Sequence, residues 1–248
     1  MILDEVKIIY EDENIVAINK PSGFVVHYDG KTDEPNLCDW ILKKYPQIEN
    51  IGESLKLNDG KEIKRPGIVH RIDRETSGVL LIVKNQKTFL NLKNQFKNRE
   101  IKKIYNAFVY GEIKENHGII NKPIGKSRKD FRQRSASDKA RGELRDAITE
   151  YKVLKKNSST KLGAGKDFSF VEISPKTGRT HQIRVHFKLI NHPIVCDKLY
   201  SGKRECALGF ERLALHAFSV EFKNTNGIIL RIEAPLPNDF KRALAFLK

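Results

Sequence analysis

The stretch PGIVHRIDRETSGVLLIVKN, residues 66–85, has the most informative pattern in the sequence. Two stretches that contain β-branched residues, 67–73 and 78–83, are separated by a short polar segment, a pattern that predicts strand, tight turn and strand. Asp73 lies where the first predicted strand ends, and the neighbouring cations Arg71 and Arg74 favour an ionised carboxylate. On periodicity alone, an ordinary turn with a surface ion pair is the simpler interpretation.

The rest of the chain shows further strand and helix patterns on both sides of this stretch. The alternation of apolar residues predicts strands at 6–10, 15–20, 104–110, 147–154, 168–174, 212–222 and 228–234. Helices are predicted over 37–45, 86–99, 180–190 and from Asn238 onward. Residues 157–166 read as a mobile hairpin loop. With no internal repeat and no long linker, a single domain over 1–248 is the simplest expectation.

Composition points to a polyanionic partner. Lys and Arg number 46 against 31 Asp and Glu, which gives a formal net charge of +15. Such an excess suits RNA or DNA, because Lys and Arg that neutralise phosphates release counterions; a generally Lys-rich surface is the plainer alternative. The three cysteines are widely spaced, the N-terminus lacks a signal-peptide core, and no apolar run could span a bilayer. We therefore expect a cytoplasmic protein with no membrane partner.

Two motifs that would indicate a cofactor are incomplete in this sequence. Gly125-Lys126-Ser127 resembles the end of a phosphate-binding loop, but Ile120 stands where that motif needs its first glycine. His181 and His186 are five residues apart, off a shared helical face, and no zinc motif accompanies them. Neither a nucleotide cofactor nor a metal is expected.

The segment HRIDRETSG, residues 70–78, resembles the H-R-L-D-x-x-T-S-G signature of the RluA family of pseudouridine synthases, with Ile72 in place of leucine. Further blocks resemble the family in its own order along nearly the whole chain. They are NKPSGFVVH at 19–27, KKIYNAFVYG at 102–111, KTGRTHQIRVH at 176–186, RLALHAFSVEF at 212–222 and APLPNDF at 234–240.

The resemblance implies an α+β pseudouridine synthase fold, with a bent, mainly antiparallel mixed sheet, surrounding helices and a basic active-site cleft. It implies an enzyme that isomerises specific uridines of ribosomal or transfer RNA and needs no cofactor. We expect the protein to be a monomer. Many family members carry a small RNA-binding domain ahead of the catalytic one. Here the resemblance begins near residue 10, so we expect the catalytic domain alone.

The resemblance also implies roles for individual residues. Asp73 matches the catalytic aspartate, Tyr105 the tyrosine that packs on the target uracil, and Arg184 the arginine paired with the aspartate. Arg71 matches the arginine that enters the base stack beside a flipped-out nucleotide. As alternatives, Tyr105 would be a core residue, Arg184 a phosphate contact and Arg71 a partner for a surface acid. We expect further RNA contacts from Arg74, Lys102, Lys103, Arg128, Arg132, Arg179 and His181.

Two stretches carry most of the expected RNA-binding charge. Residues 84–104 hold seven Lys or Arg against one Glu, and residues 121–134 hold six against one Asp. Phe131 interrupts the second stretch and is a candidate for base stacking. A solvated basic face is the alternative for each of these residues.

Two rival functions remain open. One is an RNA-binding assembly factor without catalysis, which the complete set of Asp73, Arg71, Tyr105 and Arg184 disfavours. The other is a hydrolase that cleaves a sugar bond. That chemistry would need a second positioned carboxylate or a metal cluster, and neither stands out.

Overall fold

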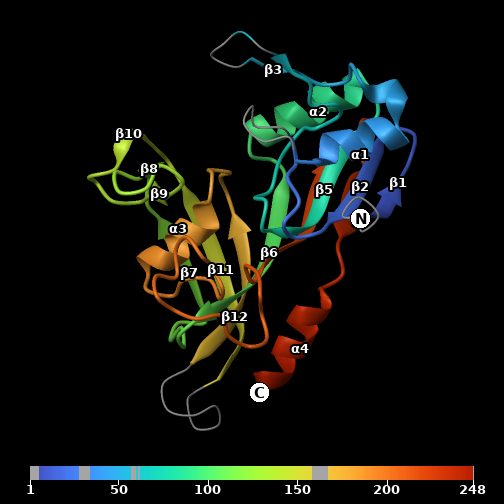
Figure 1. The fold of residues 1–248 in the computed structure, drawn as a ribbon. Helices are drawn as coiled ribbons and strands as arrows, with labels where there is room; N and C mark the ends of the chain where they lie inside the picture. Colours follow the sequence, from blue (N-terminus) through green and yellow to red (C-terminus); the bar gives the residue numbers. More distant parts are fainter. Residues whose placement is uncertain (1–5, 28–33, 57–59, 61, 158–166, 248) are drawn as a thin grey trace. The chain divides into compact units, whose positions relative to one another are not determined.

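The computed structural model describes residues 6–27, 34–56, 60, 62–157 and 167–247. The chain forms two compact units, drawn in Figure 1. The first unit consists of residues 1–102 and 217–235, and the second of residues 103–216 and 236–248. The expectation of one catalytic domain over the whole chain stays a prediction.

The first unit is built on a sheet with strand order β1-β2-β5-β13, and β14 pairs with β13. Its strands are β1 (Lys7–Glu11), β2 (Ile15–Lys20), β5 (Ser77–Val83), β13 (Leu215–Lys223, in this unit from Ala217) and β14 (Ile229–Glu233). Its other elements are α1 (Leu37–Lys44), the 3₁₀ turn η2 (Pro46–Ile48), β3 (Leu55–Lys56), β4 (Glu62–Ile63) and α2 (Gln86–Lys97). Asn36 and Asn85 cap the two α-helices by accepting backbone N–H bonds.

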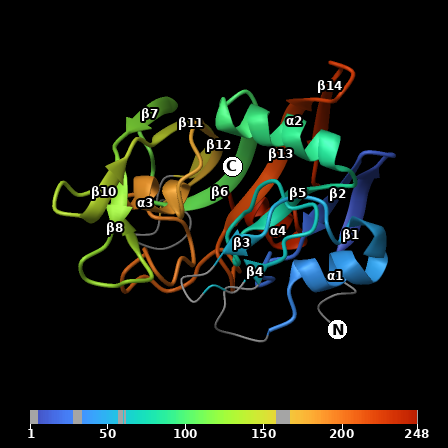
Figure 2. The same cartoon turned by 90° about the horizontal axis from the view of Figure 1, so that it is seen from above.

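Strand β5 lies at the centre of the first unit, and all seven of its side chains are buried. Alternate residues of a strand face opposite sides of a sheet, so Val79, Leu81 and Val83 share one face. These three pack in one cluster with Phe89 and Leu92 of α2. Figure 2 shows α1 on the other side of the strands from α2. Both faces of β5 are therefore covered, which explains its unbroken apolar sequence.

The second unit is built on antiparallel pairs in the order β6-β12-β11-β7. Its elements are β6 (Lys102–Tyr110, in this unit from Lys103), β7 (His117–Asn121), β11 (Ile148–Asn157), β12 (Phe168–Pro175), α3 (Gln182–Leu189) and α4 (Asn238–Phe246). A small separate sheet contains β8 (Ile124–Lys126), β9 (Arg134–Ser135) and β10 (Arg141–Arg145). The core centres on Phe108, whose ring packs on Phe170, Phe210 and Phe240 at centroid distances of 4.8, 5.3 and 5.5 Å.

The α+β class with a mainly antiparallel sheet is confirmed, as are most of the predicted elements. The predicted strand at 67–73 is wrong. Its one ladder contact is an isolated bridge between Ile68 and Ile82, and the imidazole Nε2 of His70 accepts the Leu81 N–H at 2.9 Å. A side chain thus takes the place of a strand carbonyl. Of the loop predicted at 157–166, Asn157 belongs to β11 and residues 158–166 lie outside the described residues. No helix among those described is long and apolar enough to cross a membrane.

Candidate active site

Asp73 lies in a tight turn that leads into β5. The Thr76 N–H donates to the Asp73 carbonyl at 3.1 Å, which closes the turn. Ile72 is buried on one side of Asp73, whereas the Asp73 side chain is only partly buried. Ile72 therefore anchors the backbone of the turn in the core, whereas Asp73 keeps part of its surface accessible.

A buried lysine binds the backbone of this turn. The Nζ of Lys20 is fully buried and donates to the carbonyls of Pro21, Phe24 and Arg74 at 2.8, 2.8 and 2.9 Å. The Ser22 hydroxyl donates to the Glu75 carbonyl at 2.6 Å. These bonds tie the segment at 20–24 to the Asp73 turn, a role that the sequence did not indicate for Lys20.

Gly78, the second residue of β5, has φ +115°, a backbone conformation that residues with a side chain rarely adopt. A Cβ added to Gly78 would lie 2.1 Å from the carbonyl oxygen of Ala217 on β13. Only glycine fits this close backbone approach, and this accounts physically for the glycine that ends the signature.

The two arginines beside Asp73 differ in their surroundings. Arg71 is exposed, and its Nη1 lies 3.1 Å from the Nε2 of His27. Arg74 forms an ion pair with Glu34 at 2.9 Å and donates from Nε to the Gly23 carbonyl at 3.1 Å. A surface ion pair is therefore present at Arg74, with Glu34 as its partner.

In the second unit, Tyr105 lies on β6 opposite Ile173 of β12 and is partly buried against the core. Lys103 precedes it by two residues, so both lie on the same face of the strand. Burial lowers the pKa of Lys103 to about 8. Lys102, the last residue of the first unit, is exposed and pairs with Glu221 at 2.7 Å.

Arg184 projects from α3 and is buried in a bidentate ion pair with Asp197. His181, directly before α3, takes the left-handed conformation with φ +57°, and its Nδ1 lies 2.9 Å from the hydroxyl of Tyr200. Arg179 donates from Nε to the Asp146 carbonyl at 3.0 Å. Arg179, His181 and Arg184 thus each have an ion-pair or hydrogen-bond partner within the protein.

Residues 127–133 connect β8 to β9 and carry the remaining predicted contacts. Arg128 is exposed, and Phe131 is 84% exposed. Arg132 is held by the carboxylate of Asp130, with its Nη2 at 2.8 Å from Oδ2. An aromatic ring and an exposed cation here are open to a polyanion.

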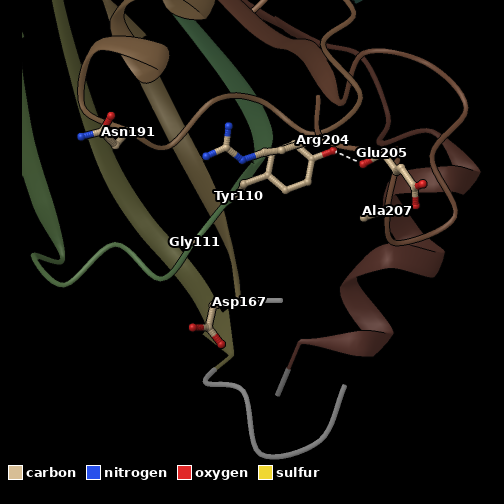
Figure 3. A pocket seen from close by; sticks show the side chains of 7 residues that line it. All are labelled: Tyr110, Gly111, Asp167, Asn191, Arg204, Glu205 and Ala207. Carbon is tan, nitrogen blue, oxygen red and sulfur yellow. Dashed lines mark hydrogen bonds between the residues drawn. The ribbon is translucent and has the colours of Figure 1, made fainter. Parts of the chain in front are cut away.

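A cavity of about 430 Å³ also lies in the second unit, and Figure 3 shows its lining. It is lined by Tyr110, Gly111, Asp167, Asn191, Arg204, Glu205 and Ala207. None of these was a predicted site residue. Near it, a disulfide joins Cys196 to Cys206, a pairing that the sequence analysis did not anticipate. Among the described residues, no group of His, Cys, Asp and Glu side chains is arranged to hold a metal ion.

Comparisons with known proteins identify the family. The model of the RNA pseudouridylate synthase family matches residues 14–189. An uncharacterized RNA pseudouridine synthase of Synechocystis is 33% identical, with 97% of this chain and 68% of that protein covered. Ribosomal large subunit pseudouridine synthase D of Borreliella burgdorferi is 38% identical, with 87% of this chain and 60% of that protein covered. The chain belongs to the RluA family of pseudouridine synthases.

The fold agrees with this assignment. Human RNA pseudouridylate synthase domain containing 1 superimposes with a TM-score of 0.73 at 24% identity, covering 95% of this chain and 85% of that one. As a member of the RluA family, the protein is an isomerase that forms pseudouridine in RNA. The residues that carry out this chemistry are a separate question.

Proposed function

We propose that this pseudouridine synthase uses Asp73 as its catalytic carboxylate and acts on flipped-out uridines of structured ribosomal or transfer RNA. The observation that carries the proposal is the turn at Asp73. Lys20 and Ser22 bind its backbone, and Asp73 follows the buried Ile72 in the turn that leads into β5, a strand with every residue buried. Preorganisation of this kind is expected of a catalytic group.

The reaction is an isomerisation, and atoms balance without a co-reactant. The bond from the ribose to the uracil nitrogen breaks, the uracil turns, and a ring carbon joins the ribose. That carbon then loses its proton to a base of the site, and the released nitrogen gains a proton, so the formula is unchanged. A carboxylate is suited to this as nucleophile or base. Nothing is oxidised, so the chemistry calls for no redox cofactor.

The remaining roles follow the family signature. A base within a helix is out of reach, so the target must leave the stack at a cost of about a few kcal/mol. Arg71 is exposed and has a planar guanidinium that suits the vacated stack. We assign Tyr105 to packing on the uracil and proton removal, and Arg184 to orienting the catalytic carboxylate.

Relatives named for the large ribosomal subunit make its RNA the first substrate to test, with transfer RNA as the alternative. We place the enzyme in the cytoplasm as a monomer. Phosphate contacts from the basic stretches would position the RNA, and unstacked bases near the target would give selectivity.

The experiment compares pseudouridine maps of total RNA from cells with the gene, without it, and complemented by the Asp73→Asn variant. Uridines that are modified only with the wild-type gene are the targets. A short stem-loop containing such a uridine is expected to be modified in vitro. If no position depends on the gene, or if the variant restores the modification, the proposal is wrong.

Lys103 gives a pH-dependent prediction. The pKa of Lys103 is lowered to about 8, so its ammonium is charged below that pH and loses its charge above it. If Lys103 contacts a phosphate, RNA affinity should fall by about fivefold between about pH 7 and about pH 9, the value of one such contact. Lys103→Arg stays charged and should bind equally at both values. A parallel fall in the variant, measured by filter binding, would exclude this role.

A further inference from the structure

The carboxylate of Asp197 binds one edge of the Arg184 guanidinium. Arg184 is 4% exposed and Asp197 is 1% exposed. Nε and Nη2 of Arg184 donate to Oδ2 and Oδ1 of Asp197, both at 2.8 Å. Two parallel bonds of this kind fix the plane of the guanidinium as well as its place. The pair uses two of the five N–H donors of the arginine.

Asp197 is in turn fixed by the backbone of its own loop. Its Oδ1 accepts the N–H groups of Leu199 and Tyr200 at 3.0 and 3.1 Å. Its carbonyl accepts the N–H groups of Tyr200 and Ser201 at 3.1 and 2.9 Å. The carboxylate therefore has one orientation before Arg184 is considered.

Tyr200 also contacts Arg184 and packs beside the ion pair. Its ring centroid lies 5.1 Å from the Cζ of Arg184, within the range of a cation–π contact. Its hydroxyl contacts His181 Nδ1 at 2.9 Å and accepts the N–H of Arg134 at 2.7 Å. The ring thus restrains Arg184 from a direction different from that of Asp197.

The segment that carries Asp197 is anchored to the core just before it. The Val195 N–H donates to the Phe108 carbonyl at 2.8 Å, and Cys196 is joined to Cys206. The Tyr110 hydroxyl accepts the Cys196 N–H at 3.3 Å and donates to the Glu205 carbonyl, the bond drawn in Figure 3. One wall of the cavity therefore also supports the residue next to Asp197.

The contribution of a buried ion pair to folding stability is too small to explain why this pair is present. Taking two charges out of water costs about as much as their attraction returns, so a buried ion pair contributes little more than apolar residues of the same shape. We infer that Asp197 is a positioning residue that sets the guanidinium of Arg184 for the isomerisation of uridine. The inference rests on the proposed function, in which Arg184 orients the catalytic carboxylate.

The chain offers a matched control in the pair of Arg212 and Asp239. Nε and Nη2 of Arg212 donate to Asp239 Oδ2 and Oδ1 at 2.7 and 3.0 Å, the same bidentate geometry. Asp239 is on α4, and neither residue belongs to the proposed site. Asp239→Asn therefore measures the loss of a bidentate ion pair in the same unit without touching Arg184.

The experiment measures single-turnover rate at saturating enzyme, RNA affinity and the urea midpoint for four variants and one double variant. They are Asp197→Asn, Asp197→Glu, Arg184→Met, Asp239→Asn and Arg184→Met/Asp197→Asn. Asp197→Glu keeps both charges but moves the carboxylate by one methylene, so it tests positioning even if Asp197→Asn fails to fold. All rates are taken well below each midpoint.

Both Asp197 variants should slow single turnover about 10- to 100-fold, the effect of a displacement of about 1 Å, and change RNA affinity less than about twofold. Asp239→Asn should keep its rate. The double variant should be no slower than Arg184→Met, because Asp197 acts only through Arg184. Wild-type rates in both Asp197 variants, beside a slow Arg184→Met, would overturn the inference alone. If Arg184→Met loses affinity but keeps its single-turnover rate, Arg184 is a phosphate contact, and its proposed role fails first.

Discussion

The Asp73→Asn variant is expected to fold, to bind RNA with wild-type affinity and to form no measurable pseudouridine. The amide has the shape of the carboxylate but lacks the negative charge that a nucleophile or base needs, and we expect a loss of at least about 10³-fold in single-turnover rate. The backbone of the turn should persist, because the bond from Thr76 to residue 73 involves the carbonyl alone. Chromatography of nucleosides from a digested stem-loop measures the product.

Glu75→Gln is the matched control for Asp73→Asn. Glu75 lies in the same turn, its contact with Ser22 is through its carbonyl, and its carboxylate is 3.8 Å from Arg74. The same change from acid to amide should leave the rate within about twofold, since partly exposed pairs of this kind contribute little. An active Asp73→Asn enzyme would refute the assignment. Free uracil in the wild-type reaction would instead favour the hydrolase.

Lys20→Met should have the largest effect on stability. The buried Nζ satisfies three carbonyls, and methionine would leave all three without that donor. Removing one partner from such a charged, buried network costs about 3–5 kcal/mol. Because one of these carbonyls belongs to Arg74, in the Asp73 turn, activity should also fall in the fraction that remains folded. Urea unfolding gives the free energy, and single turnover gives the rate.

Lys64→Met separates this effect from the general loss of a lysine. Lys64 pairs with Glu49 at 2.7 Å on the surface, where both side chains are about half exposed. An exposed pair is worth at most about 1 kcal/mol, so the midpoint should barely move. Equal midpoints for Lys20→Met and Lys64→Met would show that the three carbonyls find other partners.

The sequence predicted well those elements whose burial follows a simple period. β5 and α2 are examples, because one is apolar throughout and the other has Phe89 and Leu92 at helical spacing. It did not predict the short strands of the small sheet. β10 has five exposed residues, so it shows no alternation of apolar and polar positions.

The candidate site was predicted in part for a related reason. The family resemblance proposes Asp73 and Arg184 as site residues, which stays a prediction, and it says nothing of the residues that contact them. Lys20 contacts a carbonyl 54 residues away, and Arg184 pairs with a residue 13 positions later. Such partners are chosen by tertiary contacts, and a lone buried lysine or aspartate has no local pattern to mark it.

The division of the chain between the two units bears on how the protein folds during synthesis. The sheet of the first unit includes β13 and β14, yet residues 217–235 are made after nearly all of the second unit. The second unit in turn needs Phe240 of α4, close to the end of the chain. Chains usually fold domain by domain from the N-terminus as they emerge. Here β5 is made long before its neighbour β13, so the first unit cannot be completed until residues 217–235 have been made, and the second needs residue 240 as well.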